Sequence, residues 1–501
     1  MIKVDHISMI HNSPLIPHRA RLIPTPTSWS GVESLIIAGQ LPALREAIPT
    51  LNLNLDAPLR SLSSEDKGGI ARTFVTLEDG ADLQVSLCAL PMRATRMNHS
   101  GRPDILAKRV AELANGSCST AILVCPTEDE HIEALTAAVS RGLPALSRKS
   151  GESAKPKAVD VSIFGVSDPD RLESLERLAE GVSHAASWVD LPPDELNVPE
   201  MVEAAREVAV RVGAEIDVFE GEQLMHMGAG GLWGVGRAAK HHPALVVLRG
   251  PRSAPKAPQM VWVGKGIMYD TGGLSLKPKG SMGGMKMDMG GAAAVLGAFE
   301  VAAGRGEATD LCAILCLAEN AIGPDAIRND DIIRIYSGKT VEINNTDAEG
   351  RLVLGDGVAY ATEHLDASVV VDVATLTGAQ LVATGRTFAA VVSNDEALER
   401  AAVEVGRESG DLTHPLPYCP ELLIAEFKSQ VADMKNSVKD RMNAQSSCAG
   451  HFVEAHLTDP SALWLHIDIA GPAFIKERGT GYGVALLSGL ARRWRDGSIG
   501  D

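Results

Sequence analysis

Short apolar runs separated by polar or glycine-rich segments mark the first third of the chain. Five of these runs have the length of strands, and two longer segments repeat apolar residues at helical spacing. The expected strands are Ser34–Ala38, Phe74–Thr76, Leu83–Leu87, Ala121–Val124 and Val159–Phe164, and the expected helices are Pro103–Ala114 and Glu128–Ser140. Residues 1–165 are therefore predicted to form a smaller α/β domain. Arg96, His99 and Arg102 within it are typical of a solvated loop.

A long amphipathic helix follows this domain. Within Asp168–Val189, leucines and a valine recur at helical spacing, and two prolines end the segment. We predict a connecting helix over residues 166–190 and a larger C-terminal domain over residues 191–501.

Strand-like and helix-like segments alternate along the larger domain. The expected strands are Glu215–Phe219, Ala244–Arg249, Gln259–Val263, Leu311–Leu317, Val369–Val373, Ala389–Val392 and Ala462–Ile469. The expected helices are Val198–Val212, Ala292–Ala303, Glu396–Glu408, Ala444–His456 and Val484–Arg493, with a hairpin at Ile332–Ile343. Valine-rich runs such as Val369–Val373 are typical of strands buried on both faces. The predicted fold is α/β, with a central, mainly parallel sheet flanked by helices.

Composition narrows the class of protein. The 501 residues exceed what one hydrophobic core usually holds, and 45% hydrophobic with 22% charged residues is typical of a soluble enzyme. A net charge of −17 argues against binding to nucleic acid or to anionic membranes. The most apolar run, residues 368–385, carries Asp372, so we expect no membrane span. Seven cysteines without a CxxC pair, and no leader pattern at the N-terminus, predict a cytoplasmic protein.

Two stretches gather charged residues among glycines and methionines. Gly264–Gly291 reads GKGIMYDTGGLSLKPKGSMGGMKMDMGG, and Asn344–Leu352 reads NNTDAEGRL. Each charged residue has a simple structural explanation by itself. Spacing alone favours a solvated Lys265, Asp288 could pair with a helix N-terminus, and Glu349 fits a capping box that begins at Thr346.

The carboxylates as a set point to a metal site. Asp270, Asp288, Asp347 and Glu349 cannot all stay ionised close together unless cations lie between them. The sequence has no HExxH and no alternative cluster of His or Cys. The set therefore predicts a carboxylate-rich site for two divalent ions, which would activate a bridging water or hydroxide.

These stretches resemble the leucyl (cytosol) aminopeptidase family of dinuclear metallo-exopeptidases. NTDAEGRL, residues 345–352, is that family's signature, and the GKG…YDTGG…K…DMGG block matches in order and spacing. VDVATLTGA, HPLPYCPE, ADMKNS and HIDIAGPA extend the resemblance over most of residues 190–501. It looks closest to a branch of probable aminopeptidase-like proteins, whereas residues 1–165 match loosely.

The resemblance implies a role for each site residue. Lys265, Asp270, Asp288 and Glu349 would hold one divalent ion, and Asp270, Asp347 and Glu349 the other. The ions would be zinc or manganese, with magnesium and cobalt as alternatives. Lys277 would polarise the scissile carbonyl, and Arg351 would hold a bicarbonate as general base. The implied substrate-binding residues are Met285, Asn345, Thr375, Leu376, Gly378, Ala470 and Ala473.

The implied reaction is removal of N-terminal residues from short peptides by a homohexamer of two stacked trimers. Ala473 departs from the family, which has methionine there, so we expect a reshaped pocket and a weaker preference for leucine. The alternative is a protein of this fold with little peptidase activity and a binding or regulatory role. The retained set of charged residues argues against that alternative, because a buried charged cluster is costly to keep without use.

Overall fold

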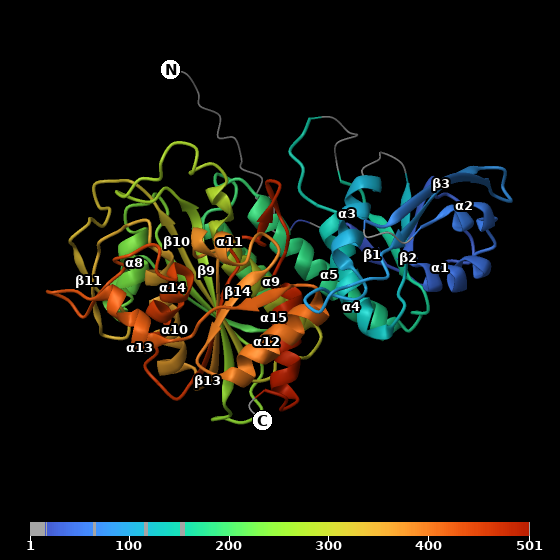
Figure 1. Cartoon of the computed structure of the whole chain (residues 1–501). Helices are drawn as coiled ribbons and strands as arrows, with labels where there is room; N and C mark the ends of the chain where they lie inside the picture. Colours follow the sequence, from blue (N-terminus) through green and yellow to red (C-terminus); the bar gives the residue numbers. More distant parts are fainter. Residues whose placement is uncertain (1–15, 17, 64–66, 115–118, 151–155, 500–501) are drawn as a thin grey trace, which may run out of the picture.

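Two β-sheets carry the described part of the chain (Figure 1). The computed structural model describes residues 16, 18–63, 67–114, 119–150 and 156–499. The smaller sheet has the order β1-β6-β5-β2-β4-β3, and all neighbours are parallel except β3 and β4. Its strands are β1 (Ala20–Leu22), β2 (Ser34–Gln40), β3 (Gly69–Thr76), β4 (Asp82–Leu90), β5 (Thr120–Cys125) and β6 (Val159–Ile163).

Helices cover both faces of the smaller sheet. α1 (Leu41–Ala47) packs on one face, and α3 (Pro103–Leu113) and α4 (Ile132–Gly142) pack on the other. The strands and helices expected from the sequence are confirmed here, with ends shifted by a few residues. The expectation of a solvated loop at residues 96–102 is wrong for His99. Its side chain is buried, and its Nδ1 accepts a hydrogen bond from the Gly101 amide at 2.8 Å.

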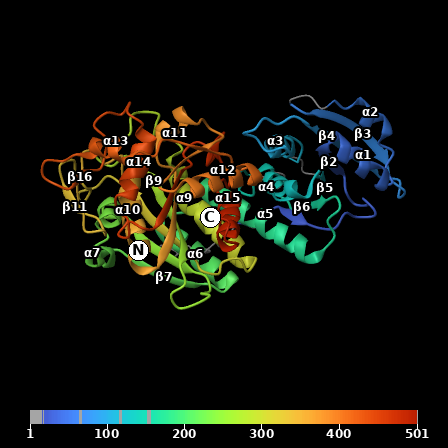
Figure 2. The ribbon, with the colours of Figure 1, turned by 60° about the horizontal axis from the view of Figure 1, so that its bottom comes forward.

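The long helix α5 (Pro169–Asp190) belongs to two hydrophobic cores. Asp168 caps it by accepting a hydrogen bond from the Arg171 amide. Leu172 and Leu175 in its first half pack into the core of the smaller sheet, whereas Val182 in its second half packs into the core of the larger one. Figures 1 and 2 show the two lobes meeting along this helix. The domain boundaries at residues 165 and 190 stay predictions.

The larger sheet has the order β15-β14-β17-β13-β9-β10-β8-β7. Its four central strands, β17, β13, β9 and β10, are mutually parallel, which confirms the parallel-rich sheet. Antiparallel pairs join β14 to β17, β8 to β10 and β7 to β8. The strands are β7 (Glu215–Glu220), β8 (Ala244–Arg249), β9 (Gln259–Asp270), β10 (Leu311–Asn320), β13 (Ala367–Ala374), β14 (Ala389–Ser393), β15 (Thr413–Pro415) and β17 (Leu463–Asp468).

Alternate residues of the central strands serve two separate cores. Met260 and Trp262 of β9 face one core, and Val261 and Val263 face the other, as the two-residue period of a strand requires. The first core is covered by α5, α6 (Val198–Val212), α9 (Gly290–Gly304), α12 (Glu396–Ser409) and α15 (Val484–Arg495). The second is covered by α8 (Gly230–Gly236), α10 (Gly350–His364) and α14 (Gln445–Glu454).

A small third sheet brings a distant segment to the edge of the large one. The expected hairpin is confirmed as β11 (Ile332–Arg334) and β12 (Thr340–Glu342), which are antiparallel. β12 also pairs in parallel with β16 (Met434–Lys435). Asn436, which follows β16, therefore lies beside the stretch that begins at Asn344. Within the described residues, the helices include none with the length and apolar character of a membrane span.

Candidate metal centre

The charged residues of the two stretches meet at one edge of the large sheet. The four parallel strands all end there: β10 at Asn320, β9 at Asp270, β13 just before Thr375 and β17 at Asp468. Ligand sites of α/β sheets collect at the carboxyl ends of parallel strands.

Lys265 lies inside a strand, although the expected strand ends two residues before it. β9 continues seven residues beyond the predicted end at Val263, to Asp270. The reason lies in the glycines around Lys265, which lower strand propensity but permit close packing. A Cβ on Gly264 would lie 2.7 Å from the Cα of Ala292 in α9, so only glycine lets helix and strand come this close. Lys265 is 2% exposed, and the solvated alternative is therefore wrong.

The ammonium of Lys265 contacts three oxygen atoms. Its Nζ lies 2.8 Å from Asp288 Oδ1, 3.0 Å from Glu349 Oε1 and 3.0 Å from the carbonyl of Thr375. Gly350 makes room for it, because a Cβ there would lie 2.8 Å from Nζ. Asp288 comes from the 3₁₀ helix Met285–Met289, and its carboxylate faces Lys265 and Thr375 rather than capping α9.

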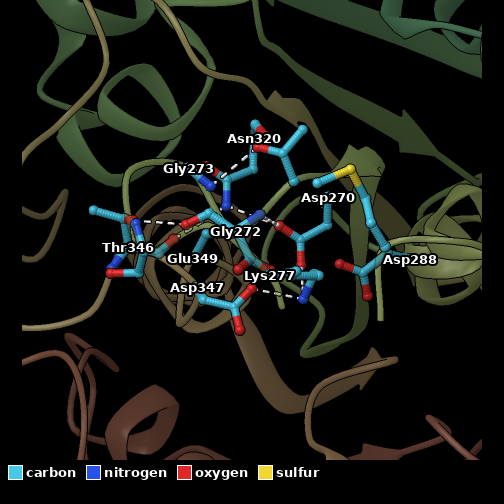
Figure 3. Close-up of polar contacts among 12 residues, drawn as sticks. Asp270, Gly272, Gly273, Lys277, Asp288, Asn320, Thr346, Asp347 and Glu349 are labelled. Atoms are coloured by element: carbon cyan, nitrogen blue, oxygen red, sulfur yellow. Dashed lines mark hydrogen bonds and ion pairs between the residues drawn. The ribbon is translucent and has the colours of Figure 1, made fainter. Parts of the chain in front are cut away.

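Lys277 lies between the other two carboxylates, as Figure 3 shows. Its Nζ is 2.6 Å from Asp270 Oδ2 and 2.6 Å from Asp347 Oδ1. One oxygen each of Asp270, Asp347 and Glu349 lie within 4.8 Å of one another. The two lysines thus separate four carboxylates into two pairs, and the group carries a net negative charge when all six are ionised.

Burial and mutual repulsion shift the pKa values of this group. Burial, with the nearby charge of Asp270, raises the pKa of Glu349 to about 8, and burial raises the pKa of Asp288 to about 6. Burial alone would lower the pKa of Lys265, but the carboxylates of Asp288 and Glu349 outweigh it and raise that pKa well above its usual value. The positive charge of the two ammonium groups therefore does not balance the negative charge of the four carboxylates.

The side chains fit divalent cations. Asp288 Oδ2 and Glu349 Oε2 are buried and have no hydrogen-bond partner among the described residues. Unpaired buried carboxylate oxygens are costly and are the preferred ligands of hard divalent ions. Four carboxylates that share a cavity suit two such ions better than one. Lys265 can act as a ligand only after it loses its proton, which a nearby pair of divalent charges favours.

Arg351 provides a positive charge beside the carboxylates. It is 4% exposed, its Nη1 donates to the carbonyl of Asn436 at 2.9 Å, and the rings of Phe427 and Phe452 lie 5.8 and 5.9 Å from its guanidinium carbon. No carboxylate among the described residues lies within ion-pair distance of it. Burial lowers the pKa of Arg351 to about 10. A buried guanidinium without a counter-ion suits a small anion.

Several uncharged residues hold the two stretches together, and two of them, Asn320 and Asn436, were not predicted as part of the site. Asn320 Nδ2 donates to Asp270 Oδ1 and to the carbonyl of Thr346. Thr346 Oγ1 donates to the carbonyl of Gly272, so the capping box expected at Thr346 is absent and that alternative is wrong. Asn436 Nδ2 donates to the carbonyl of Asn345. Asn436 lies within ADMKNS, which pointed to the segment but not to its contact.

A cavity of about 380 Å³ opens over the carboxylates. Its walls include these expected substrate-binding residues: Met285, Asn345, Thr375, Leu376, Gly378 and Ala470. Ala473 lies behind the wall, where it is buried and packs near Gly290. Met287 and Arg441 also line the cavity, and neither was predicted from the sequence.

Lys286 anchors the segment that carries Asp288. Its ammonium donates to the carbonyl of Asp190, the last residue of α5. The carboxylate of Asp190 accepts the amide of Gly479 at 2.7 Å and pairs with Arg478. A cation at a helix C-terminus satisfies an unpaired carbonyl and the helix dipole. Lys286 is therefore a support of the site rather than a part of it.

Comparison with known proteins agrees with this geometry. Residues 183–488 match the family described as the cytosol aminopeptidase family, catalytic domain, and residues 33–152 match the M17 aminopeptidase N-terminal domain 2. The probable aminopeptidase NPEPL1 of Mus musculus is 48% identical over 419 residues, 81% of this chain and 79% of that protein. Leucine aminopeptidase 1 of Caenorhabditis elegans is 46% identical over 323 residues, 64% of this chain and 65% of that protein.

Solved structures show the same two-domain architecture. The leucyl aminopeptidase of Trypanosoma cruzi has a TM-score of 0.89 at 36% identity, covering 96% of this chain and 98% of that one. The leucyl aminopeptidase of Trypanosoma brucei in complex with bestatin has a TM-score of 0.87 at 35% identity, covering 96% of each chain. With a catalytic-domain match over more than half its length, this chain belongs to the cytosol aminopeptidase family of metal-dependent aminopeptidases.

Proposed function

We propose that this chain removes N-terminal residues from short peptides with the help of two divalent ions. One observation carries the proposal: four carboxylates, two with unpaired buried oxygens, converge in one cavity at the sheet edge. Lys265, Asp270, Asp288, Asp347 and Glu349 would hold the ions, which we expect to be zinc or manganese. When bound, such ions polarise a substrate and supply a nucleophilic water at neutral pH.

The residues of the chain would divide the remaining work. Lys277 would turn from Asp270 and Asp347 toward the scissile carbonyl and stabilise the oxyanion as charge develops on it. Arg351 would hold a bicarbonate as general base, so that a proton leaves the attacking water and reaches the departing amine as the C–N bond breaks. Asp288 lies next to Lys265 and would also receive the substrate's free amino group, which restricts cleavage to the first residue.

The pocket for the first side chain would lie beside Met285, Thr375 and Ala470. We propose that preference for leucine is weak, since Ala473 behind this wall is smaller than the methionine of the family pattern. Hydrolysis of leucine, phenylalanine and arginine amides would be compared, and a sharp preference for leucine would contradict this part. We also propose a cytoplasmic homohexamer of two stacked trimers. Light scattering on the purified protein tests the assembly.

Hydrolysis of leucyl-p-nitroanilide and of dipeptides with added Mn²⁺ or Zn²⁺ tests the proposed reaction. The Lys277→Ala and Glu349→Ala variants should lose the activity, and Lys279→Ala is a matched control because Lys279 is exposed on the same loop. Activity absent with every metal, or equal in all three variants, would instead favour the binding or regulatory role. The retained charges at the site argue against that role.

A further inference from the structure

The cavity over the carboxylates continues into a second, more apolar groove of about 540 Å³. The two share Gly378, Arg441 and Gln445 as lining residues, so they form one continuous depression. The groove is lined mainly by small and apolar residues, among them Val382, Ala383, Leu416, Pro417 and Met442. A ligand whose amino end is held at the carboxylates has room to extend into this groove.

Arg441 lies at the junction of the two spaces with its charge uncompensated. It is exposed, and the described residues include no hydrogen-bond or ion-pair partner for it. Two acidic residues near this segment accept backbone amides instead: Asp440 accepts the amide of Met442, and Glu426 accepts the amide of Asp440. An unpaired cation at the mouth of this cavity attracts an anionic group.

The start of helix α14 adds further donors at the same place. Its first residues, Gln445, Ser446 and Ser447, line the groove, and the amides at a helix start have no partner within the helix. Ser446 donates its hydroxyl to Asp468 at 3.1 Å. Ser447 is 1% exposed, yet its hydroxyl has no partner among the described residues. The Ser447 hydroxyl at the groove wall, the unpaired amides and the helix dipole together favour an anion here.

A carboxylate fits these donors, because guanidinium groups bind carboxylates through two parallel hydrogen bonds. We infer that Arg441 and the start of α14 bind the C-terminal carboxylate of a short peptide, whose last side chain lies in the apolar groove. This inference rests on the proposed function, which places the peptide's amino end at the carboxylates. It specifies the substrates as di- and tripeptides with a free C-terminus and an apolar last residue.

The test compares peptides that differ in one group. Leu-Phe and Leu-Gly-Phe are each assayed as the free acid and as the C-terminal amide, with Mn²⁺, in wild type, Arg441→Gln and Arg407→Gln. Arg407 is a matched control, because it is an exposed arginine that lines a different cavity. We expect the wild type to prefer the free acid by about tenfold in kcat/KM for at least one length, mainly through KM, as a charge-assisted contact provides. The preference should fall with added salt.

Arg441→Gln should bring the acid-to-amide ratio close to one, and Arg407→Gln should leave the ratio unchanged. Equal rates for acid and amide at both lengths in wild type would overturn the inference while leaving the proposed function intact. A preference for the free acid that persists in Arg441→Gln would also overturn the inference. If no peptide is hydrolysed under any metal, the proposed function fails. Calorimetric binding of the same acid and amide pairs then decides whether the carboxylate site exists.

Discussion

Loading the chelator-treated protein with Mn²⁺ should release protons, and their number reports whether Lys265 becomes a ligand. Metal ligands must be deprotonated, so binding expels any proton that they carry. Without bound ions, Glu349 has a pKa of about 8 and Asp288 a pKa of about 6. The two carboxyls together then hold roughly 1.2 protons at pH 6.5 and roughly 0.2 at pH 8.5. Their contribution to the release should fall by about one proton between these pH values.

Lys265 behaves differently because its pKa is raised well above the usual value. Its amine keeps its proton at both pH values until an ion displaces that proton. Coordination by Lys265 therefore adds about one proton to the release at pH 6.5 and at pH 8.5 alike. A Lys265→Arg variant keeps the positive charge that lowers the pKa values of Asp288 and Glu349 but cannot give up a proton, whereas any proton lost from a bound water is common to both proteins.

Titration calorimetry in two buffers of different ionisation enthalpy measures the release. The expected result is a difference of about one proton between wild type and Lys265→Arg at both pH values. Lys279→Arg is the matched control, since Lys279 is exposed on the loop between Asp270 and Asp288, and it should release as many protons as wild type. Equal release from wild type and Lys265→Arg would refute the assignment of Lys265 as a ligand.

Three further changes have defined outcomes. Lys277→Ala should lower kcat on leucyl-p-nitroanilide by about 10²–10³ with little effect on KM, the range for loss of one oxyanion donor, whereas Lys279→Ala should not. Asp372→Asn should lower the free energy of unfolding in urea by about 3 kcal/mol, because it breaks a buried ion pair with His466. Burial by itself lowers the pKa of His466, but Asp372 outweighs burial and raises that pKa. The loss of stability is therefore full below about pH 6.5 and shrinks as the pH rises through the raised pKa of His466. Gly264→Ala should cost about 1–3 kcal/mol by overpacking against α9 and should weaken Mn²⁺ binding, whereas Gly283→Ala meets nothing within 4 Å and should be tolerated on steric grounds.

Most of the fold could be predicted from hydrophobic spacing alone. The Val198–Val212 helix and the Ala244–Arg249 strand were predicted with the ends that the structure shows. Long periodic segments are predictable because local burial decides them. The end of β9 was not, because glycines interrupt the pattern. There the structure follows a tertiary contact, the approach of α9, which no local pattern encodes.

The carboxylates of the site could be identified from charge density, but their geometry could not. Lys277 lies between Asp270 and Asp347, which are 77 residues apart, and local spacing says nothing about such a contact. Asn436 gave no chemical signal, because a buried asparagine that binds backbone carbonyls is common. Arg441 lies outside the recognised motifs, so its position at the cavity could be found only from the structure.

The far end of α5 joins three parts of the molecule at one residue. Asp190 receives Lys286 from the segment that carries Asp288, and it pairs with Arg478, which also donates to Leu146 of the N-terminal lobe. The two lobes are therefore not interchangeable modules. A replacement of the N-terminal lobe would have to preserve the start of α5 and this junction, or Asp288 would lose its fixed position. Divergence of the N-terminal lobe within the family should accordingly be slowest at the face that packs on α5.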